Sequence, residues 1–549
     1  MKKIALFVLA GIALFGLTAC EAFKDMFYFG GSEYKPRSDV STPPPGDTEA
    51  HNAPNGYRYE TYVKNNVYRL SATPSSGTPR LLVIPVWFED SNTYIQTTKK
   101  ENVREDIQKV YFGTNEETGW RSVSSYYYEE SHGAVTLSGT VSEWYNCGQY
   151  LNYYAVDDGS AKTSDLVVSA IDWYFTGHSE EHRTDYDYDH DGYLDGVMLI
   201  YAAPDYDNDN FKSINPSNKN KTNLWAYCFW IQDQGVNHKN VSNPGPNAYF
   251  WASYDFMYNN SAARERAGNS FGSGDTKYAT VDAHTYIHEM GHMFGLEDYY
   301  DYSDNKYSPA ASFSMQDHNI GSHDPFSCYA LGWAKAYVPI ETTVINLKPF
   351  TSSGEVILLS PNASSYNYSP FDEYLLLEYY TPDGLNEFDT LHKYLKDSGK
   401  LYPTGPNERG IRLWHVDARL AYIYAGNFSA SKMTTDPGYS QRVKLAMSNT
   451  YYASNVPDSY LSPLKDEDLS HSYCNYNLLQ LIKKNGSGWK SKDSLTSAML
   501  YRDNQTFSMN EAANQFVRSG KLNSGLDLGF SFKVNALNSG YASIEVTKL

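Results

Sequence analysis

The stretch HEMGHMFGLED, residues 288–298, decides what kind of fold and chemistry this chain carries. His288 and His292 are four positions apart, so in a helix their imidazoles lie one turn apart on one face, with Glu289 beside them. Two imidazoles in this arrangement can share a tetrahedral cation such as zinc. The sequence of residues 283–293 predicts the helix that this geometry requires.

A third metal ligand is expected directly after that helix. Gly295 has the backbone freedom to end the helix and to turn the chain back, which brings Asp298 towards the cation. Glu297 stays the alternative, because a shift of one residue along the backbone decides which carboxylate faces inward. Two histidines and one carboxylate leave a coordination position for water, which is typical of a catalytic rather than a structural zinc site.

Glu289 is the expected general base. A bound zinc ion lowers the pKa of its water towards about 7, and a neighbouring carboxylate can take the proton as that water attacks a carbonyl. Glu289 would then return the proton to the leaving amine, while the metal holds the developing oxyanion. The sequence therefore predicts a zinc-dependent endopeptidase that hydrolyses peptide bonds in a protein or peptide substrate.

A second metal-binding pattern is DYDHDGYLD, residues 187–195, which follows the first nine positions of an EF-hand-type calcium loop. The expected calcium ligands are Asp187, Asp189, Asp191, the carbonyl of Tyr193, and Asp195. Met198 stands where an EF-hand has its bidentate glutamate, and a strand is expected to follow in place of a helix. We expect a structural Ca²⁺ here, the alternative being a solvated acidic turn.

The first residues resemble a bacterial lipoprotein signal. Lys2 and Lys3 precede a short apolar run, residues 4–17, and small residues lead to Cys20. We expect residues 1–19 to be a cleaved signal peptide and Cys20 to be lipidated, which gives an exported, membrane-anchored lipoprotein at the cell surface. The alternative is an ordinary signal peptide or an N-terminal anchor in which Cys20 has no role.

Composition excludes several other classes of protein. The chain has 549 residues, of which 41% are hydrophobic, so it can bury real cores. Its net charge of −19 repels phosphate backbones, and nucleic acid is not an expected partner. Beyond Cys20 there are four cysteines, whose spacing favours no disulfide pairing.

Three further segments follow from composition and hydrophobic pattern. Residues 20–79 are rich in Ser, Pro and Gly and predict a tether, which can include a short pro-segment at 57–70. Residues 80–339 mix strand and helix patterns, as in an α/β catalytic domain. Residues 340–549 contain strand-like runs between Gly, Pro and Asn and predict a β-rich domain.

The expected regular elements share clear apolar patterns. Helices are expected at 100–111 and 163–175. Strands are expected at 81–88, 134–141, 196–201, 343–347, 355–359, 373–380, 410–416, 441–447, 530–534 and 542–546. His415 and Asp417 share one face of the strand around 410–416, and there we expect a structural hydrogen bond rather than a second metal site.

Several motifs together point to a known family. They are H-E-x-x-H-x-x-G-x-x-D in residues 288–298 followed by YYD, WFED at 87–90, SYYYEESHG at 125–133, Ser314-Met315, and LGW at 331–333. In these motifs the chain resembles the immune inhibitor A family of secreted bacterial metallopeptidases, in the metzincin clan.

The resemblance implies a fold class and further site residues. It implies an α/β (α+β) metzincin-like zinc peptidase domain followed by a β-rich, sandwich-like C-terminal domain. It also implies that Met315 forms the methionine turn beneath the metal, and the clan spacing favours Asp298 over Glu297 as third ligand. Many members of this clan have a tyrosine shortly after this methionine. Here Met315 is followed by Gln316, Asp317 and His318, so that tyrosine is absent at the expected offset.

Two other functions remain open on sequence alone. One is a catalytically inert surface adhesin or glycan-binding lipoprotein on a peptidase scaffold, which the richness in aromatic residues would suit. The other is a metal hydrolase that acts on a non-peptide bond. The natural substrate and the oligomeric state do not follow from the sequence.

Overall fold

The computed structural model describes residues 46, 48–54, 73–157, 159–206, 221, 223–231, 236–258, 281–300, 308–391, 405–424, 433–434, 440–445, 476–488 and 491–549. The predicted signal peptide with Cys20, most of the predicted tether, the candidate pro-segment at 57–70 and Cys474 lie outside these residues.

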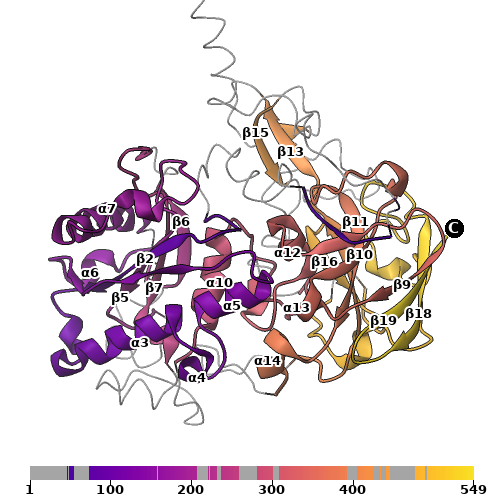
Figure 1. The fold of residues 1–549 in the computed structure, drawn as a ribbon, viewed down its shortest axis with the longest axis horizontal. Coiled ribbons are helices and arrows are strands. Elements are labelled where there is room, and N and C mark those ends of the chain that lie inside the picture. Colours follow the sequence, from indigo (N-terminus) through magenta and orange to yellow (C-terminus); the bar gives the residue numbers. More distant parts are fainter. Residues whose placement is uncertain are drawn as a thin grey trace, which may run out of the picture.

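A mixed sheet forms the centre of the N-terminal region (Figure 1). Its strand order is β3-β2-β5-β7-β6, with β4 also paired to β2. The strands are β2 (Arg80–Trp87), β3 (Ser138–Val141), β4 (Tyr145–Asn146), β5 (Val197–Tyr201), β6 (Tyr227–Trp230) and β7 (Ala248–Ser253). The pairs of β2 with β3, β4 and β5, and of β5 with β7, are parallel, whereas β6 runs antiparallel to β7. The predicted α/β architecture of this region is confirmed.

Both faces of this sheet are buried, which explains its continuous apolar strands. In β2, Leu81 and Val83 belong to one core, and Leu82 and Ile84 belong to the core on the opposite face. Helices cover the two faces, with α7 on one side and α3 and α10 on the other (Figure 1). The helices here are α3 (Lys100–Phe112), α4 (Asn115–Thr118), α5 (Val123–Glu130), α6 (Leu151–Tyr154), α7 (Ser160–Gly177) and α10 (His284–Met293).

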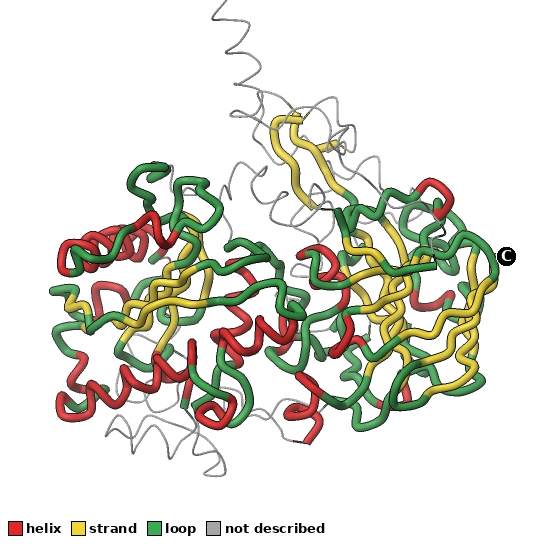
Figure 2. The backbone as a smooth tube through the Cα atoms, in the orientation of Figure 1, coloured by secondary structure: helices red, strands yellow, loops and turns green. Residues whose placement is uncertain are grey.

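The C-terminal region is dominated by strands (Figure 2). One sheet has the order β1-β8-β10-β11-β12-β16 and another the order β17-β18-β19-β9. The strands of the first are β1 (His51–Asn52), β8 (Lys335–Tyr337), β10 (Glu355–Leu359), β11 (Glu373–Tyr380), β12 (Gly410–Asp417) and β16 (Leu479–Ile482). Those of the second are β9 (Thr343–Leu347), β17 (Thr506–Phe507), β18 (Phe530–Leu537) and β19 (Ala542–Lys548). A small sheet of order β14-β13-β15 contains β13 (Leu420–Tyr424), β14 (Met433–Thr434) and β15 (Ser440–Leu445). The predicted β-rich character of the C-terminal region is confirmed.

Short helices connect these strands. The α-helices are α11 (Met315–His318), α12 (Pro325–Leu331), α13 (Phe350–Ser353) and α14 (Glu387–Leu391). The 3-10 helices of the described chain are η2 (Ser91–Thr93), η3 (Thr97–Lys99), η4 (Arg183–Tyr186), η7 (Tyr254–Met257), η8 (Ala363–Ser365), η9 (Gly384–Asn386), η14 (Ser497–Met499) and η15 (Ala513–Gln515).

One hydrophobic core spans both regions. It contains Val83 of the N-terminal sheet, Met290 of α10 and Leu331 of α12. It continues into Leu376 of β11 and Trp414 of β12 in the C-terminal region. Helix α10 accordingly lies between the two halves of the molecule (Figure 1). The helix that carries the predicted metal ligands is thus packed at a junction.

The N-terminal tether was predicted to reach residue 79, but parts of it pack in the fold. His51 and Asn52 pair with β8, and the Thr73 N–H donates to the carbonyl of Met293 at the end of α10 (2.8 Å). The predicted boundary after residue 339 remains a prediction, and β8, which precedes it, pairs with β10 of the C-terminal sheet.

No helix within the described ranges is both long and apolar enough to span a membrane.

Candidate metal centre

Helix α10 brings the two predicted histidines together, as expected. Ile287, Met290 and Met293 bury its apolar side in the core, which leaves His288 and His292 on another side. The helix ends at Met293, and shortly after it Gly295 has a φ of +99°, in the left-handed region that favours glycine. The Leu296 N–H then donates to the carbonyl of Gly291 (3.1 Å), which turns the chain back towards the helix.

This turn places Asp298 between the two imidazoles. Its Oδ1 lies 3.0 Å from Nε2 of His288 and 3.3 Å from Nε2 of His292. The three residues form a group whose ligand atoms all lie within 4.8 Å of one another. Glu297 lies outside this group. One oxygen and two nitrogens at these separations fit the donor set of a zinc ion.

Backbone carbonyls orient both rings. Nδ1 of His288 donates to the carbonyl of Met315 (2.7 Å), and Nδ1 of His292 donates to the carbonyl of Leu296 (2.8 Å). Since a carbonyl can only accept, each Nδ1 carries hydrogen, and in the neutral ring Nε2 then holds the free lone pair. Both rings are therefore in the tautomer that a metal requires, with the lone pairs facing Asp298.

Met315, the residue of the predicted methionine turn, contacts His288. It is buried at the start of α11. Its carbonyl accepts a hydrogen bond from Nδ1 of His288, and the next residue, Gln316, packs on Gly291 of α10. A Cβ at Gly291 would lie 2.1 Å from Oε1 of Gln316, so a larger residue there would force this side chain away. Sequence reasoning missed that contact, because a glycine inside a helix does not by itself indicate which side chain packs against it.

Glu289 lies buried beside the metal-binding group. Its Oε2 has no hydrogen-bond partner among the described residues. Burial raises the pKa of Glu289, and the nearby His292 and His288 oppose this rise. A buried carboxylate oxygen without a protein partner fits a site in which water or substrate supplies the missing contact.

The electrostatics of the group favour a cation. Burial raises the pKa of Asp298, but His292 and His288 outweigh it and hold that pKa well below its ordinary value. Burial lowers the pKa of His292, and Asp298 more than reverses this, to about 9. The carboxylate thus stays ionised and attracts positive charge, which a proton or a metal ion can supply.

The predicted calcium loop also folds as a compact acidic turn. Asp187, Asp189 and Asp195 form a group of potential metal ligands. The N–H groups of Asp191 and Gly192 donate to Asp187 (both 3.0 Å), and Gly192 has a φ of +90°, as the sharp turn requires. Asp191 lies outside the group, and its Oδ1 accepts from the N–H of Tyr193 (2.9 Å).

Asp195 is the most strongly perturbed residue of this loop. Burial, together with the negative charges of Asp189 and Asp187, raises the pKa of Asp195 to about 8 against the hydrogen bonds from backbone N–H groups. Three carboxylates this close repel one another, and a hard divalent cation would relieve that repulsion. Met198 is buried in β5, so no glutamate completes the loop as in an EF-hand.

Part of the N-terminal region matches a known protein family. Residues 77–224 match the family model described as immune inhibitor A peptidase M6, catalytic domain. This segment is similar to the catalytic domain of that family. The predicted resemblance and the predicted enzyme class, a zinc metalloendopeptidase, are thereby confirmed. No curated protein matches the chain.

The M6 match ends before the metal-binding group. It covers β2, α5, the acidic loop and β5, whereas α10 begins only at His284. Two segments that carried the resemblance lie inside it, WFED at 87–90 and SYYYEESHG at 125–133. The residues after 224 are assigned to the site on geometry.

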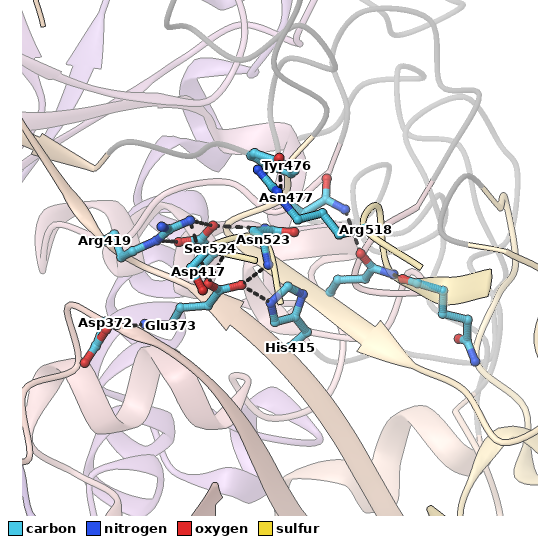
Figure 3. Close-up of polar contacts among 12 residues, drawn as sticks. Asp372, Glu373, His415, Asp417, Arg419, Tyr476, Asn477, Arg518, Asn523 and Ser524 are labelled. Carbon is cyan, nitrogen blue, oxygen red and sulfur yellow. Dashed lines mark hydrogen bonds and ion pairs between the residues drawn. The ribbon is translucent and has the colours of Figure 1, made fainter. Parts of the chain in front are cut away.

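A buried polar cluster in the C-terminal region of this chain accounts for His415. Its Nε2 lies 2.9 Å from Oε1 of Glu373, while Asp417 accepts from Arg419 and from Asn523 (Figure 3). The expected structural hydrogen bond of His415 is confirmed. Among the described residues, His415 and Asp417 belong to no group of three metal-ligating side chains.

His323 and three cysteines lie in the described ranges outside these groups. His323 is fully buried. Its backbone N–H donates to Oε1 of Glu130 (3.1 Å), and its ring Nε2 lies 3.2 Å from the hydroxyl of Tyr127. No disulfide joins the cysteines in the described ranges, Cys147, Cys228 and Cys328.

Proposed function

We propose that this chain is an exported zinc endopeptidase that cleaves peptide bonds in protein substrates, with zinc held by His288, His292 and Asp298. The observation that carries the proposal is the position of Asp298 Oδ1, 3.0 Å and 3.3 Å from the two Nε2 atoms, in a buried group next to Glu289. The M6 match supports the class of enzyme independently of that geometry.

Each residue then has a role that its surroundings suit. A bound zinc ion supplies Lewis acidity, which activates water and polarises a peptide carbonyl. Glu289 takes the proton from the attacking water and passes it to the leaving amine, and its raised pKa suits a group that must hold a proton between these steps. The carbonyls of Met315 and Leu296 keep the two imidazoles oriented.

Asp298 is our choice as the third ligand in preference to Glu297. The buried carboxylate of Asp298 faces both histidines, and Glu297 is outside the group. The family spacing, in which the third ligand comes ten positions after the first histidine, agrees with this choice.

Structural calcium in the acidic loop is a further part of the proposal. Asp187, Asp189 and Asp195 would bind the ion directly, and the loop pattern adds Asp191 and the carbonyl of Tyr193. The raised pKa of Asp195 supports it, because a buried acidic group of this kind needs a proton or a cation.

We also propose that Cys20 carries a lipid and tethers the enzyme to a membrane, with residues 20–79 as the tether. The basic start, the apolar run and the small residues before Cys20 support this. The division into a catalytic domain at 80–339 and a sandwich-like domain at 340–549 belongs to the same proposal.

Hydrolysis of casein by the purified protein tests the central part. We expect activity that a chelator removes and zinc restores in the presence of calcium. Glu289→Ala should lower kcat by a factor of about 10² to 10⁴ and leave the zinc content unchanged. Full activity in Glu289→Ala would refute the assignment of the base.

The same assay separates the rival functions. An inert adhesin or glycan-binding protein would show no chelator-sensitive proteolysis although zinc is bound. A hydrolase of non-peptide bonds would leave casein intact and cleave an ester substrate in a zinc-dependent reaction.

A further inference from the structure

The loop that carries Met315 is held by residues from the C-terminal region. We call residues 308–324 the Met315 loop. The N–H groups of Leu481 and Leu495 donate to the carbonyls of Pro309 and Ala311 (both 2.9 Å). Arg412 of β12 donates from Nη1 to the carbonyl of Phe313 (3.3 Å). These bonds join the loop to chain segments that lie roughly a hundred residues or more further along the sequence.

Asn386 of η9 holds the second half of this loop. Its Oδ1 accepts from the N–H of Ser322 (3.1 Å) and from its hydroxyl (3.3 Å). Its Nδ2 donates to the carbonyl of Thr381 (3.1 Å), which sets the orientation of the amide. The side chain is 1% exposed, so water cannot replace these bonds easily.

Asp389 of α14 joins the loop to the catalytic helix. Its Oδ2 accepts from the N–H of Gly321 (2.7 Å) and lies 3.4 Å from Nε2 of His284 on α10. His284 is further held by Asp282, whose Oδ1 is 2.7 Å from Nδ1, and by the Trp120 ring stacked on it at 4.2 Å. Asp389 thus connects two elements that must keep a constant separation around the metal centre.

A short chain of bonds links these contacts to His288. The N–H of Met315 donates to the carbonyl of Ser322 (3.3 Å), and the carbonyl of Met315 accepts from Nδ1 of His288 (2.7 Å). The position of Ser322 therefore determines where Met315 lies, and Met315 determines the direction of the His288 lone pair.

We propose that Asn386 and Asp389 are positioning residues of the metal centre, contributed by the C-terminal region. They act through the Met315 loop, and their hydrogen bonds go to Gly321, Ser322 and His284 rather than to the metal-binding residues. This inference rests on the proposed role of His288 as a zinc ligand. Partners that orient metal ligands typically change metal affinity by 10-fold to 100-fold when they are removed, and a support one bond further away should lie near the lower figure.

The full-length protein with Asn386→Ala or Asp389→Ala tests the proposal. Two readouts report on the centre apart from turnover: the zinc dissociation constant from competition with a chromogenic chelator, and the visible absorption spectrum of the cobalt-loaded protein. Asn523→Ala is the matched control, because Asn523 is a buried asparagine of the same region that binds Asp417 in the polar cluster of Figure 3.

We expect about 10-fold weaker zinc binding and a changed cobalt spectrum in both alanine variants, and wild-type values in Asn523→Ala. Asp389→Asn and Asn386→Asp keep an acceptor oxygen for the loop N–H groups and should stay within about 3-fold of wild type. These two variants keep the test informative if an alanine variant does not fold.

Wild-type zinc affinity and cobalt spectrum in folded alanine variants would overturn the proposal. Equal weakening in Asn523→Ala would also overturn it, because the effect would then be general destabilisation. Loss of zinc affinity in Asp389→Asn as large as in Asp389→Ala would contradict the role of the acceptor oxygen. A wild-type protein that binds no zinc would instead refute the proposed function itself.

Discussion

At the scale of single residues, one carboxylate oxygen accounts for the geometry of the metal centre. Oδ1 of Asp298 is close to both imidazoles, and both rings turn their Nε2 atoms towards it because carbonyls hold Nδ1. Asp298 can reach this position because Gly295 adopts a left-handed backbone conformation.

Asp298→Ala and Glu297→Ala distinguish the two candidate third ligands. Asp298→Ala removes a buried ligand, so we expect zinc binding at least 10²-fold weaker and no measurable proteolysis. Glu297→Ala should bind zinc as wild type does, because Glu297 is outside the group. Equilibrium dialysis with zinc measures both variants, and the reverse order of affinities would assign the ligand to Glu297.

His284 predicts a pH dependence of stability. Burial lowers the pKa of His284, but Asp282 and Asp389 more than reverse this and raise it to about 10, above the unfolded value of about 6.5. The stabilisation is therefore present in full below pH of about 6.5 and is lost as the pH rises through about 10. Urea unfolding at several pH values should show His284→Gln less stable than wild type by about 2 kcal/mol at pH 7, with a smaller difference near pH 10.

His182→Gln is the control for that measurement, because it makes the same substitution at an exposed position. It should leave the unfolding free energy within about 0.5 kcal/mol of wild type at each pH. A difference between His284→Gln and wild type that grows towards pH 10 would contradict the assigned charge of His284.

At the scale of elements, the sequence predicted long apolar strands and helices well. Strands at 343–347, 355–359 and 373–380 have the predicted bounds, and α3 and α7 extend the predicted helices by a few residues. The expected strand at 134–141 is shorter, since β3 begins only at Ser138. Short elements such as β16 (Leu479–Ile482) were missed because four residues carry too little periodicity.

The acidic loop between η4 and β5 gives a prediction at the same scale. Calcium at about 100 times its dissociation constant should stabilise the protein by about 2.7 kcal/mol, seen as a rise in Tm. Asp189→Asn removes one carboxylate of the group and should reduce that rise by more than half.

Asp185→Asn is its matched control. Asp185 is an exposed acid just before the loop and lies outside the group, so the calcium-dependent rise in Tm should persist. Equal calcium responses in Asp189→Asn and wild type would contradict a bound ion in the loop.

At the scale of the whole molecule, the two regions share one core. Residues of α10 and α12 lie in the same hydrophobic cluster as Leu376 and Trp414, and the Met315 loop is bonded to Leu481 and Leu495. The sequence could predict that His288 and His292 lie on one face of a helix, because they are only four residues apart. It could not predict these contacts, because pairing between residues far apart in the chain leaves no periodic pattern.

A chain that ends at residue 339 should therefore fail to form a working metal centre. Removing the C-terminal region exposes the apolar residues that pack on it and deletes Asn386, Asp389 and the partners of the Met315 loop. We expect no cooperative unfolding transition and strong binding of an apolar dye, measured by circular dichroism and fluorescence. A cooperatively folded fragment that binds zinc with wild-type affinity would show that the catalytic region is independent.

The central claim is that zinc binds two imidazoles and one carboxylate and keeps a position for solvent. X-ray absorption spectroscopy at the zinc edge of the purified, zinc-loaded protein measures this directly. We predict one zinc ion per chain with two nitrogen ligands at about 2.0 Å and oxygen ligands in the remaining positions, and loss of one oxygen ligand from the protein in Asp298→Ala. A centre without zinc, or with four protein side chains bound, would contradict the account.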